Sequence, residues 1–394
     1  MTRLRRNRDF VLLQAGQLLS TLGGSFTAVA YPLLILGLTS SPAKAGLVSA
    51  ARIVGAPLLI LPAGIAADRL DRRRIMLAAD AVRALAVGSI AVLVALHPVF
   101  WPLPFLAFVE GAGEAFFAAC SSGALRSVVP PDQLADAVSV QTGRAAVVGI
   151  AGPPVGGALF GVGRAIPFAA DAASYLFSFA SLAALRTPLQ EHRDEEAGRI
   201  RERLAEGWRF LMSRPFLRVT TFLYGVENFT IPATTFVLVV VAHAHGLTGG
   251  QIGLLLSAFS ACILAGSALA ATARRRLSPR AIMLLELYLG LGTIAYVLVP
   301  SVWVLAAAIL PQAVALPITD SVVVSRRLQL TPDRLLGRVE AVRVTIARGA
   351  APAGPLVAGL LLASISGRAT IAIFAAIAVV LLAWGLLTPA LREA

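Results

Sequence analysis

Apolar segments of 18 or more residues recur along the whole chain, and this feature limits the possible folds more than any other. Each segment is long enough to cross a hydrocarbon core of roughly 30 Å as a helix. Only 14% of the 394 residues are charged, and the mean hydropathy is +0.80, whereas a soluble domain usually carries about 25% charged residues. The sequence therefore predicts an all-α membrane protein rather than a soluble one.

Twelve such segments follow one another, and at about 21 residues each they take up most of the chain. The predicted spans are 10–38, 45–66, 75–96, 102–124, 137–162, 165–186, 216–242, 250–272, 281–299, 301–323, 342–366 and 369–388. Because the number of spans is even, both ends of the chain are expected on the same side of the membrane.

Basic residues gather on alternate connections between these spans. Of the 34 basic residues, 26 fall on the side that holds both termini, and the opposite side holds only Lys44, Arg164 and Arg368. Basic loops stay in the cytoplasm, so both termini are expected to be cytoplasmic. The formal net charge of +13 is thereby explained by membrane topology, and no nucleic-acid partner is expected.

The two halves of the chain repeat one another. The segment 131–134 (PDQL) matches 332–335 (PDRL), and Gly152-Pro153 matches Gly354-Pro355. Such a duplication predicts two pseudo-symmetric six-helix bundles, residues 1–186 and 215–394, with a shared site near the middle of the bilayer. The linker 187–214 carries apolar residues at helical spacing among Arg and Glu, which predicts an amphipathic helix on the cytoplasmic surface.

The connection between the second and third spans carries a motif of one glycine, one aspartate and several arginines. Gly64, Asp68, Arg69, Arg72 and Arg73 resemble the signature loop of the major facilitator superfamily, although Asp71 stands where the family has a second glycine. The resemblance implies the major facilitator fold with twelve spans, and transport by alternating access.

Two further motifs resemble exporters within this superfamily. The fifth span contains Gly149, Gly152, Pro153, Gly156 and Gly157, a run similar to the motif of proton-coupled exporters. The segments 203–215 and 129–132 resemble the branch that contains macrolide and enterobactin-type exporters. The alternative for the glycine run is helix packing alone, because small residues let helices approach closely.

These resemblances imply a bacterial inner-membrane protein that exports hydrophobic or amphiphilic small molecules in exchange for protons. The expected partners are a small-molecule substrate, protons and the lipid bilayer, and the protein is expected to be a monomer. One alternative is an importer or facilitator of the same fold, and another is a membrane sensor or scaffold that transports nothing. The chain has no P-loop and no catalytic arrangement in a soluble segment, so neither an enzyme nor a cofactor is expected.

Ionisable residues inside the spans are the main candidates for function, since each costs roughly 2.5–3.5 kcal/mol at the centre of a span. Glu110 and Glu114 lie one helical turn apart, so two charges would face each other in a low dielectric. Together with Glu227 and Asp320 they are the proton-coupling candidates, and the resemblance places all four on helices that line the cavity. The alternative is a structural ion pair, with Arg52 or Arg144 as the partner. Asp171 and Glu286 lie nearer the span ends, where a structural role is more usual.

The residues of the signature loop are candidates for a gate that opens and closes the transport path. Asp68 can face the positive end of a neighbouring helix, a contact worth about 0.3–1 kcal/mol or more when partly buried. Arg72 and Arg73 are expected to engage acids such as Asp80, and the alternative is a basic loop that only sets topology. The candidates for lining the substrate cavity are polar or aromatic residues within spans: Gln14, Gln17, Tyr31, Phe117, Tyr224, Asn228 and Gln312. His243 and His245 lack further ligands, so no metal site is expected.

Overall fold

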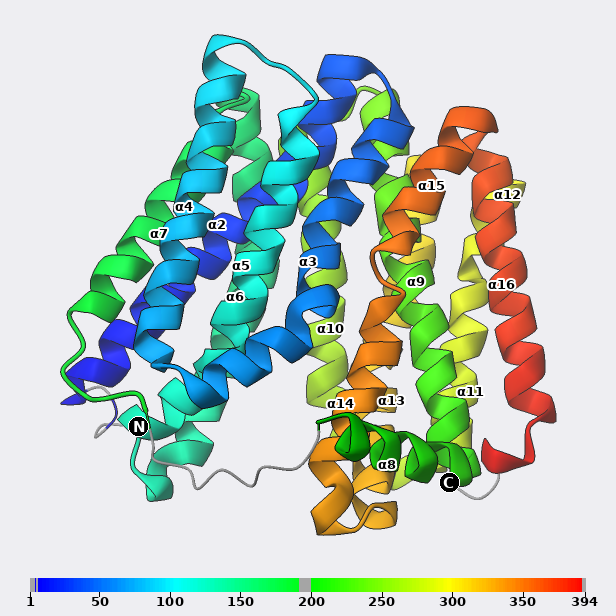
Figure 1. Ribbon diagram of the computed structural model, residues 1–394. Helices are drawn as coiled ribbons and strands as arrows, with labels where there is room; N and C mark the ends of the chain where they lie inside the picture. The colour runs from blue at the N-terminus through cyan, green and yellow to red at the C-terminus, as the bar shows by residue number, and fades with distance from the viewer. Residues whose placement is uncertain (1–3, 5, 191–199, 392–394) are drawn as a thin grey trace. The chain divides into compact units, whose positions relative to one another are not determined.

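The computed structural model describes residues 4, 6–190 and 200–391, and twelve of the helices within them are long and apolar enough to cross a membrane (Figure 1). The predicted number of spans is confirmed, and most helices begin and end within about one turn of the predicted bounds, although α13 continues to Leu330 and α14 begins at Asp333. The first six spans are α2 (Arg8–Thr39), α3 (Pro42–Arg69), α4 (Arg72–Leu96), α5 (Pro102–Val128), α6 (Leu134–Val162) and α7 (Ile166–Ala183). The others are α9 (Pro215–Ala244), α10 (Gly249–Arg276), α11 with α12 (Pro279–Gly290, Ile294–Leu298), α13 (Val302–Leu330), α14 with α15 (Asp333–Gly349, Ala353–Ser364) and α16 (Gly367–Leu387).

Two of the predicted spans are interrupted helices. A 3-10 turn, η2 (Leu291–Thr293), separates α11 from α12, and the Thr293 hydroxyl donates to the Gly290 carbonyl at 3.1 Å. Residues 350–352 separate α14 from α15. Pro352 lacks an N–H donor, so it cannot continue the hydrogen-bond ladder of α14. The freed backbone groups are tolerated where neighbouring helices surround them.

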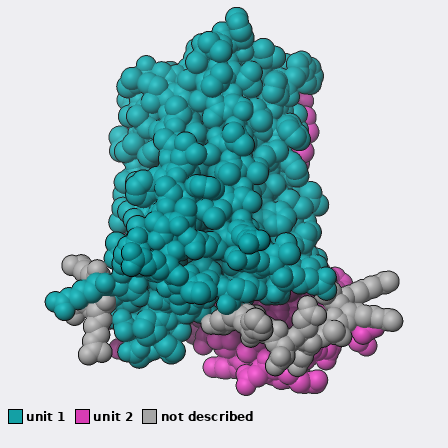
Figure 2. Space-filling view, turned by 60° about the vertical axis from the view of Figure 1, so that its left-hand side comes forward, with its two compact units in different colours: residues 1–195, 246–257 teal, residues 196–245, 258–394 magenta. Residues whose placement is uncertain are grey.

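The chain forms two compact units, which Figure 2 distinguishes by colour. Unit 1 comprises residues 1–195 and 246–257, and unit 2 comprises residues 196–245 and 258–394. Unit 1 thus holds α2–α7 and the beginning of α10, whereas the sequence repeat assigns the whole of α10 to the second bundle. The middle of the expected linker, residues 191–199, lies outside the described residues, as do Arg3, Arg5 and Arg392.

Glycine contacts explain why α10 begins in unit 1. A Cβ on Gly157 of α6 would overlap the backbone of Gly249, and a Cβ on Gly253 would overlap the backbone of Pro153. The Ser257 hydroxyl then donates to the Ile150 carbonyl at 2.6 Å. Small residues bring the backbones of α6 and α10 together, as they do at other interfaces in membranes.

Within unit 1, α3 and α5 approach each other closely at two glycines. A Cβ on Gly55 would overlap the backbone of Gly111 and Ala112, and a Cβ on Gly111 would overlap the Arg52 carbonyl. This approach places Arg52 of α3 beside Glu110 of α5. The side chains deepest in this unit include Tyr31, Phe168 and Tyr175, which are all about 1% exposed or less.

Unit 2 includes α8 (Ile200–Ser213), the amphipathic helix expected in the linker. Leu211 of α8 is buried in the apolar core of the unit, while Trp208 is exposed. A Cβ on Gly207 would overlap the backbone of Arg338, and Glu206 forms an ion pair with the Arg338 guanidinium. Helix α8 is therefore packed against α14 and belongs to the second unit.

Asp9 fastens the beginning of α2 to the segment that follows α7. Its Oδ2 accepts hydrogen bonds from the backbone N–H groups of Arg186 (3.1 Å) and Thr187 (2.8 Å) and from the Thr187 hydroxyl (2.6 Å). Asp9→Ala is expected to lower the free energy of unfolding by about 1–3 kcal/mol, because it removes three hydrogen bonds to a charged acceptor and leaves their partly buried donors without a partner. Thermal unfolding in detergent micelles measures the loss. The exposed Asp132 provides the control Asp132→Ala, and equal unfolding temperatures for the two variants would contradict the prediction.

Candidate functional site

The first candidate site surrounds Glu110 at the centre of unit 1. The Tyr31 hydroxyl donates to Oε2 of Glu110 at 2.7 Å, and Nε of Arg52 donates to Oε1 at 3.0 Å. Arg52 also donates to the Gly24 carbonyl at 3.0 Å. Glu110 is 1% exposed. A buried carboxylate is thus paired with one cation and hydrogen-bonded at both oxygens, which is what a stable buried charge requires.

Glu114, one turn further along α5, pairs with an arginine that the sequence analysis did not single out. Nη2 of Arg83, on α4, lies 2.5 Å from Oε2 of Glu114 and 2.9 Å from the Tyr175 hydroxyl. The Arg83 guanidinium lies 4.1 Å from the centre of the Tyr175 ring. Arg83 falls inside the predicted span 75–96. An arginine within an apolar span is the signal by which sequence reasoning could have found it.

Tyr175 joins these two ion pairs into one network. The Tyr175 hydroxyl accepts a hydrogen bond from Nη2 of Arg83, and it donates one to Oε1 of Glu110 at 3.4 Å. The network borders a cavity of about 350 Å³, lined by Ser20, Thr21, Gly24, Arg52, Ile53, Ala56, Arg83, Glu110, Gly111 and Glu114. Both carboxylates of the predicted pair line this cavity, and each has its own arginine.

Arg144 and Asp80 have partners other than those that the sequence suggested. Nη1 of Arg144, on α6, donates to the side-chain oxygens of Gln14 (2.8 Å) and Gln17 (2.6 Å) on α2, so its partners are amides and not the expected acids. It lines a mainly apolar cavity of about 430 Å³ together with Gln14. Asp80 lies 3.9 Å from Nη1 of Arg83, one helical turn away, and not beside the arginines of the loop. Helix rotation, which a linear sequence does not reveal, decides both outcomes.

The signature residues lie on both sides of the short loop between α3 and α4, at the end of α3 and the beginning of α4. Gly64, Asp68 and Arg69 lie in the last turns of α3, where Asp68 and Arg69 are exposed. Arg72 is buried, and its Nε donates to the Ala67 carbonyl at 3.2 Å. Arg73 donates to the Ala183 carbonyl. Arg72 and Arg73 thus donate hydrogen bonds to backbone carbonyl groups at the ends of α3 and α7.

Asp71 has a role that explains its departure from the family motif. It is the N-cap of α4, and its carboxylate accepts from the Arg74 N–H at 3.1 Å. An aspartate at this position satisfies one of the free donors at a helix start and is typically worth about 1 kcal/mol.

The glycines of the fifth span lie at helix contacts within unit 1. Gly152 faces Ser25 of α2, Gly156 faces the backbone of Phe26, and Gly157 and Pro153 face α10. Gly149 is half-buried in the same helix. Phe117, a candidate for the substrate cavity, packs in the apolar core of this unit.

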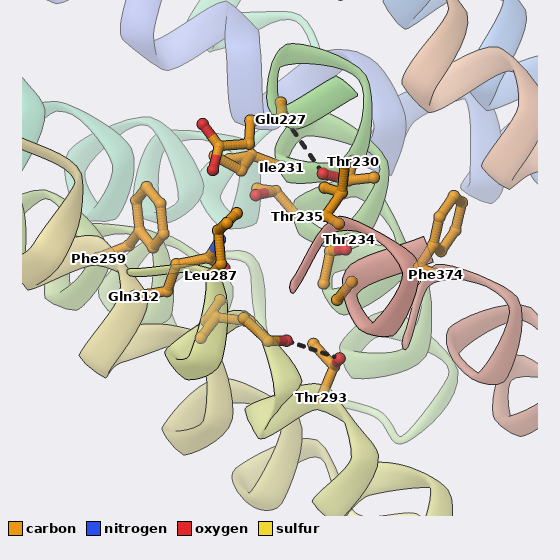
Figure 3. A pocket seen from close by; sticks show the side chains of 14 residues that line it. Glu227, Thr230, Ile231, Thr234, Thr235, Phe259, Leu287, Thr293, Gln312 and Phe374 are labelled. Atoms are coloured by element: carbon orange, nitrogen blue, oxygen red, sulfur yellow. Dashed lines mark hydrogen bonds between the residues drawn. The ribbon is translucent and has the colours of Figure 1, made fainter. Parts of the chain in front are cut away.

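The second candidate site is a pocket in unit 2 with Glu227 on its wall (Figure 3). Its free volume of about 40 Å³ is enough for one or two water molecules. Figure 3 shows the rings of Phe259 and Phe374 on opposite sides, with Thr230, Thr234 and Glu227 between them. Gln312 of α13 lines the same pocket. The walls therefore combine apolar rings with several hydrogen-bonding groups.

Glu227 also faces a second carboxyl group. Glu286, on α11, approaches closely enough to share a hydrogen bond with it, and both are buried. The sequence analysis assigned Glu286 a structural role from its place near a span end, and the signal missed was a second acid within an apolar segment. Asp320 is not part of this carboxyl pair. It accepts a hydrogen bond from the Tyr224 hydroxyl at 3.3 Å. Nδ2 of Asn228 donates to the Tyr224 carbonyl at 2.8 Å, within α9.

Twelve membrane-spanning helices in two compact units, with buried acids in both units and buried arginines in unit 1, define a polytopic transporter of the major facilitator fold. The family model described as "Transmembrane secretion effector" matches residues 4–393, and the chain belongs to this family. The predicted superfamily is confirmed.

Two curated relatives have names that state an activity. The "Multidrug efflux pump Tap" of Mycobacterium tuberculosis is 28% identical over 427 aligned residues, covering 100% of this chain and 96% of that protein. The "Macrolide efflux protein A" of Streptococcus pyogenes is 30% identical over 159 residues, which cover 39% of this chain and 38% of that protein.

Solved structures match the fold over almost the whole chain. A bacterial homologue of the human lysosomal transporter Spinster, in an inward-facing and unoccupied conformation, has a TM-score of 0.77 at 16% identity and covers 98% of this chain and 97% of that one. A bacterial homologue of the iron transporter ferroportin has a TM-score of 0.75 at 15% identity, covering 97% and 98%. At these identities the likeness concerns the fold alone.

Proposed function

We propose that this protein exports hydrophobic or amphiphilic small molecules from a bacterial cell in exchange for protons. The observation that carries the proposal is the full-length similarity to the multidrug efflux pump Tap, at 28% identity. Transport proceeds by alternating access of the two six-helix bundles, residues 1–186 and 215–394. The protein acts as a monomer and requires no cofactor.

The lining of the larger cavities in unit 1 supports an amphiphilic substrate, whereas the pocket of unit 2 has room only for water. In unit 1, the cavity beside Arg144 and Gln14 is mainly apolar. Ligand sites usually combine apolar walls with a few polar groups that orient the ligand.

Acids within the membrane-spanning helices support proton exchange, and Glu110 and Glu227 among them are buried. Glu110, Glu114, Glu227 and Asp320 lie within helices that cross the membrane, where an ionisable group is costly unless it has a function or a partner. One proton moving down a potential of 100 mV supplies about 2.3 kcal/mol, enough to drive uphill export of a substrate over a substantial gradient.

The distribution of basic residues supports an orientation with both termini in the cytoplasm. In that orientation α8, the loop 70–71 and the beginning of α14 face the cytoplasm. Asp68 then serves as a gate residue at the cytoplasmic end of α3, with Gly64, Arg69, Arg72 and Arg73 shaping the same turn.

Purified protein in liposomes with an acidic lumen and a trapped pH dye tests the proposal. Adding macrolides or lipophilic cations outside is expected to raise the lumenal pH, because substrate enters as protons leave. Empty liposomes with the same compounds are the control for passive diffusion. Substrate uptake without a pH change would overturn proton exchange, and the absence of uptake for every compound would overturn the proposed substrate class.

A further inference from the structure

Glu227 and Glu286 form a pair of buried carboxyl groups in unit 2. Glu227 is 5% exposed and Glu286 is 2% exposed, and their carboxyl groups are within reach of a shared hydrogen bond. A carboxylate only accepts hydrogen bonds, so two carboxyl groups bond to each other only when one carries a proton. Two carboxyl groups that share a site share one proton, because both charges together are too costly.

The arginines that neutralise acids in unit 1 have no counterpart at this pair. Within the described ranges 6–190 and 200–391, no ion pair joins Glu227 or Glu286 to an arginine or lysine, whereas Glu110 and Glu114 each have one. Without a cation, the pair can keep its low charge only by holding a proton.

The charged and titratable groups around the pair are accounted for by other contacts. The Tyr224 hydroxyl of α9 donates to Asp320 of α13. Further along, Arg327 and Arg343 pair with Glu340 at 2.8 and 2.7 Å. Arg327 and Arg343 are thus both paired with Glu340 of α14, and the other side chains that line the cavity beside the carboxyl pair are uncharged.

A small cavity of about 10 Å³ lies beside the pair, and it is independent evidence for a site. Thr220, Tyr224, Thr319 and both glutamates line it. The Thr319 hydroxyl is buried and lies close to Glu286, but it has no hydrogen-bond partner at normal distance. Glu227 also borders the threonine-lined pocket of Figure 3, so it connects the pair to space that water molecules can occupy.

We propose that Glu227 and Glu286 share one proton, and that this pair is the site from which the exchanged proton is released and to which it returns. On release, the proton leaves a carboxyl group for water in the pocket, and two carboxylates remain. The ion-paired Glu110 and Glu114 then stabilise the first bundle and do not carry the proton. This assignment rests on the proposed proton exchange.

Infrared spectroscopy of the detergent-solubilised protein tests the shared proton without any substrate. At neutral pH, the double variant Glu227→Gln/Glu286→Gln is expected to lack the C=O stretching intensity of one protonated carboxyl group that the wild type has. The control Asp132→Asn, which changes an exposed acid outside both candidate sites, is expected to keep it. Equal intensity in the wild type and the double variant would overturn the shared proton.

Transport in liposomes tests the role in coupling. Glu227→Gln and Glu286→Gln are expected to lose substrate-driven proton movement, down to the level of empty liposomes, and still to exchange substrate for substrate. Retained exchange excludes misfolding as the cause. The control Asp132→Asn, which changes an exposed acid outside both candidate sites, is expected to keep proton movement. Proton movement that persists in the double variant would overturn this coupling site and leave the proposed export intact, whereas a wild type without proton movement would overturn the proposed exchange itself.

Discussion

Replacing Arg83 with methionine is expected to lower the free energy of unfolding by about 3–5 kcal/mol, the usual effect of removing one partner from a buried ion pair. Arg83 is 4% exposed and lies between Asp80, Glu114 and Tyr175. Asp80 is fully buried, and its carboxylate oxygens have no hydrogen-bond partner in the described structure. Without Arg83, its charge would lose the cation 3.9 Å away. Thermal and chemical unfolding in detergent micelles measure the effect.

A second substitution separates lost charge from lost packing. Asp80→Asn in the Arg83→Met background is expected to recover part of the stability, because it removes the buried charge that the first change leaves unpaired. Arg144→Met is the matched control, since Arg144 donates to the neutral amides of Gln14 and Gln17. If Arg83→Met unfolds at the same temperature as Arg144→Met, the pairing of Arg83 does not stabilise the bundle.

Gly111→Ala is expected to destabilise unit 1 by about 1–3 kcal/mol or more, the usual range for overpacking. The added methyl group would overlap the Arg52 carbonyl, a backbone atom that cannot turn aside as a side chain can. The helices α3 and α5 would have to move apart, and the distance between Arg52 and Glu110 would grow. Unfolding temperature and the yield of monodisperse protein in detergent measure the outcome.

Gly143→Ala in α6 is the control, because nothing lies within 4 Å of a Cβ at that position. In a helix interior, alanine is favoured over glycine by about 1 kcal/mol, so this variant is expected to be as stable as the wild type or more so. A Gly111→Ala variant that unfolds like Gly143→Ala would contradict the close approach of α3 and α5.

Hydropathy made the architecture predictable. The twelve spans are found close to their predicted positions, since an apolar segment of this length can satisfy its backbone in lipid only as a helix. The motif around Gly64 and Asp68 and the repeat of Gly152-Pro153 at Gly354-Pro355 led to the superfamily, which the family match confirms. The interruption of two spans was not predicted. The turn 291–293 contains no proline, and a proline within an apolar segment does not always break its helix, since α6 continues through Pro153 and Pro154.

The partners of the buried charges were only partly predictable. Sequence spacing placed Glu110 and Glu114 on one face of a helix, and Arg52 was among the expected partners of these acids. The pairing of Glu114 with Arg83 and the meeting of Glu227 with Glu286 join helices whose rotation about their axes no local pattern reveals. The sequence by itself thus determined the membrane-spanning helices and the family, because hydropathy and motifs are local properties. Only the tertiary structure decided which buried acids gain an arginine and which face one another, because such contacts depend on how neighbouring helices pack.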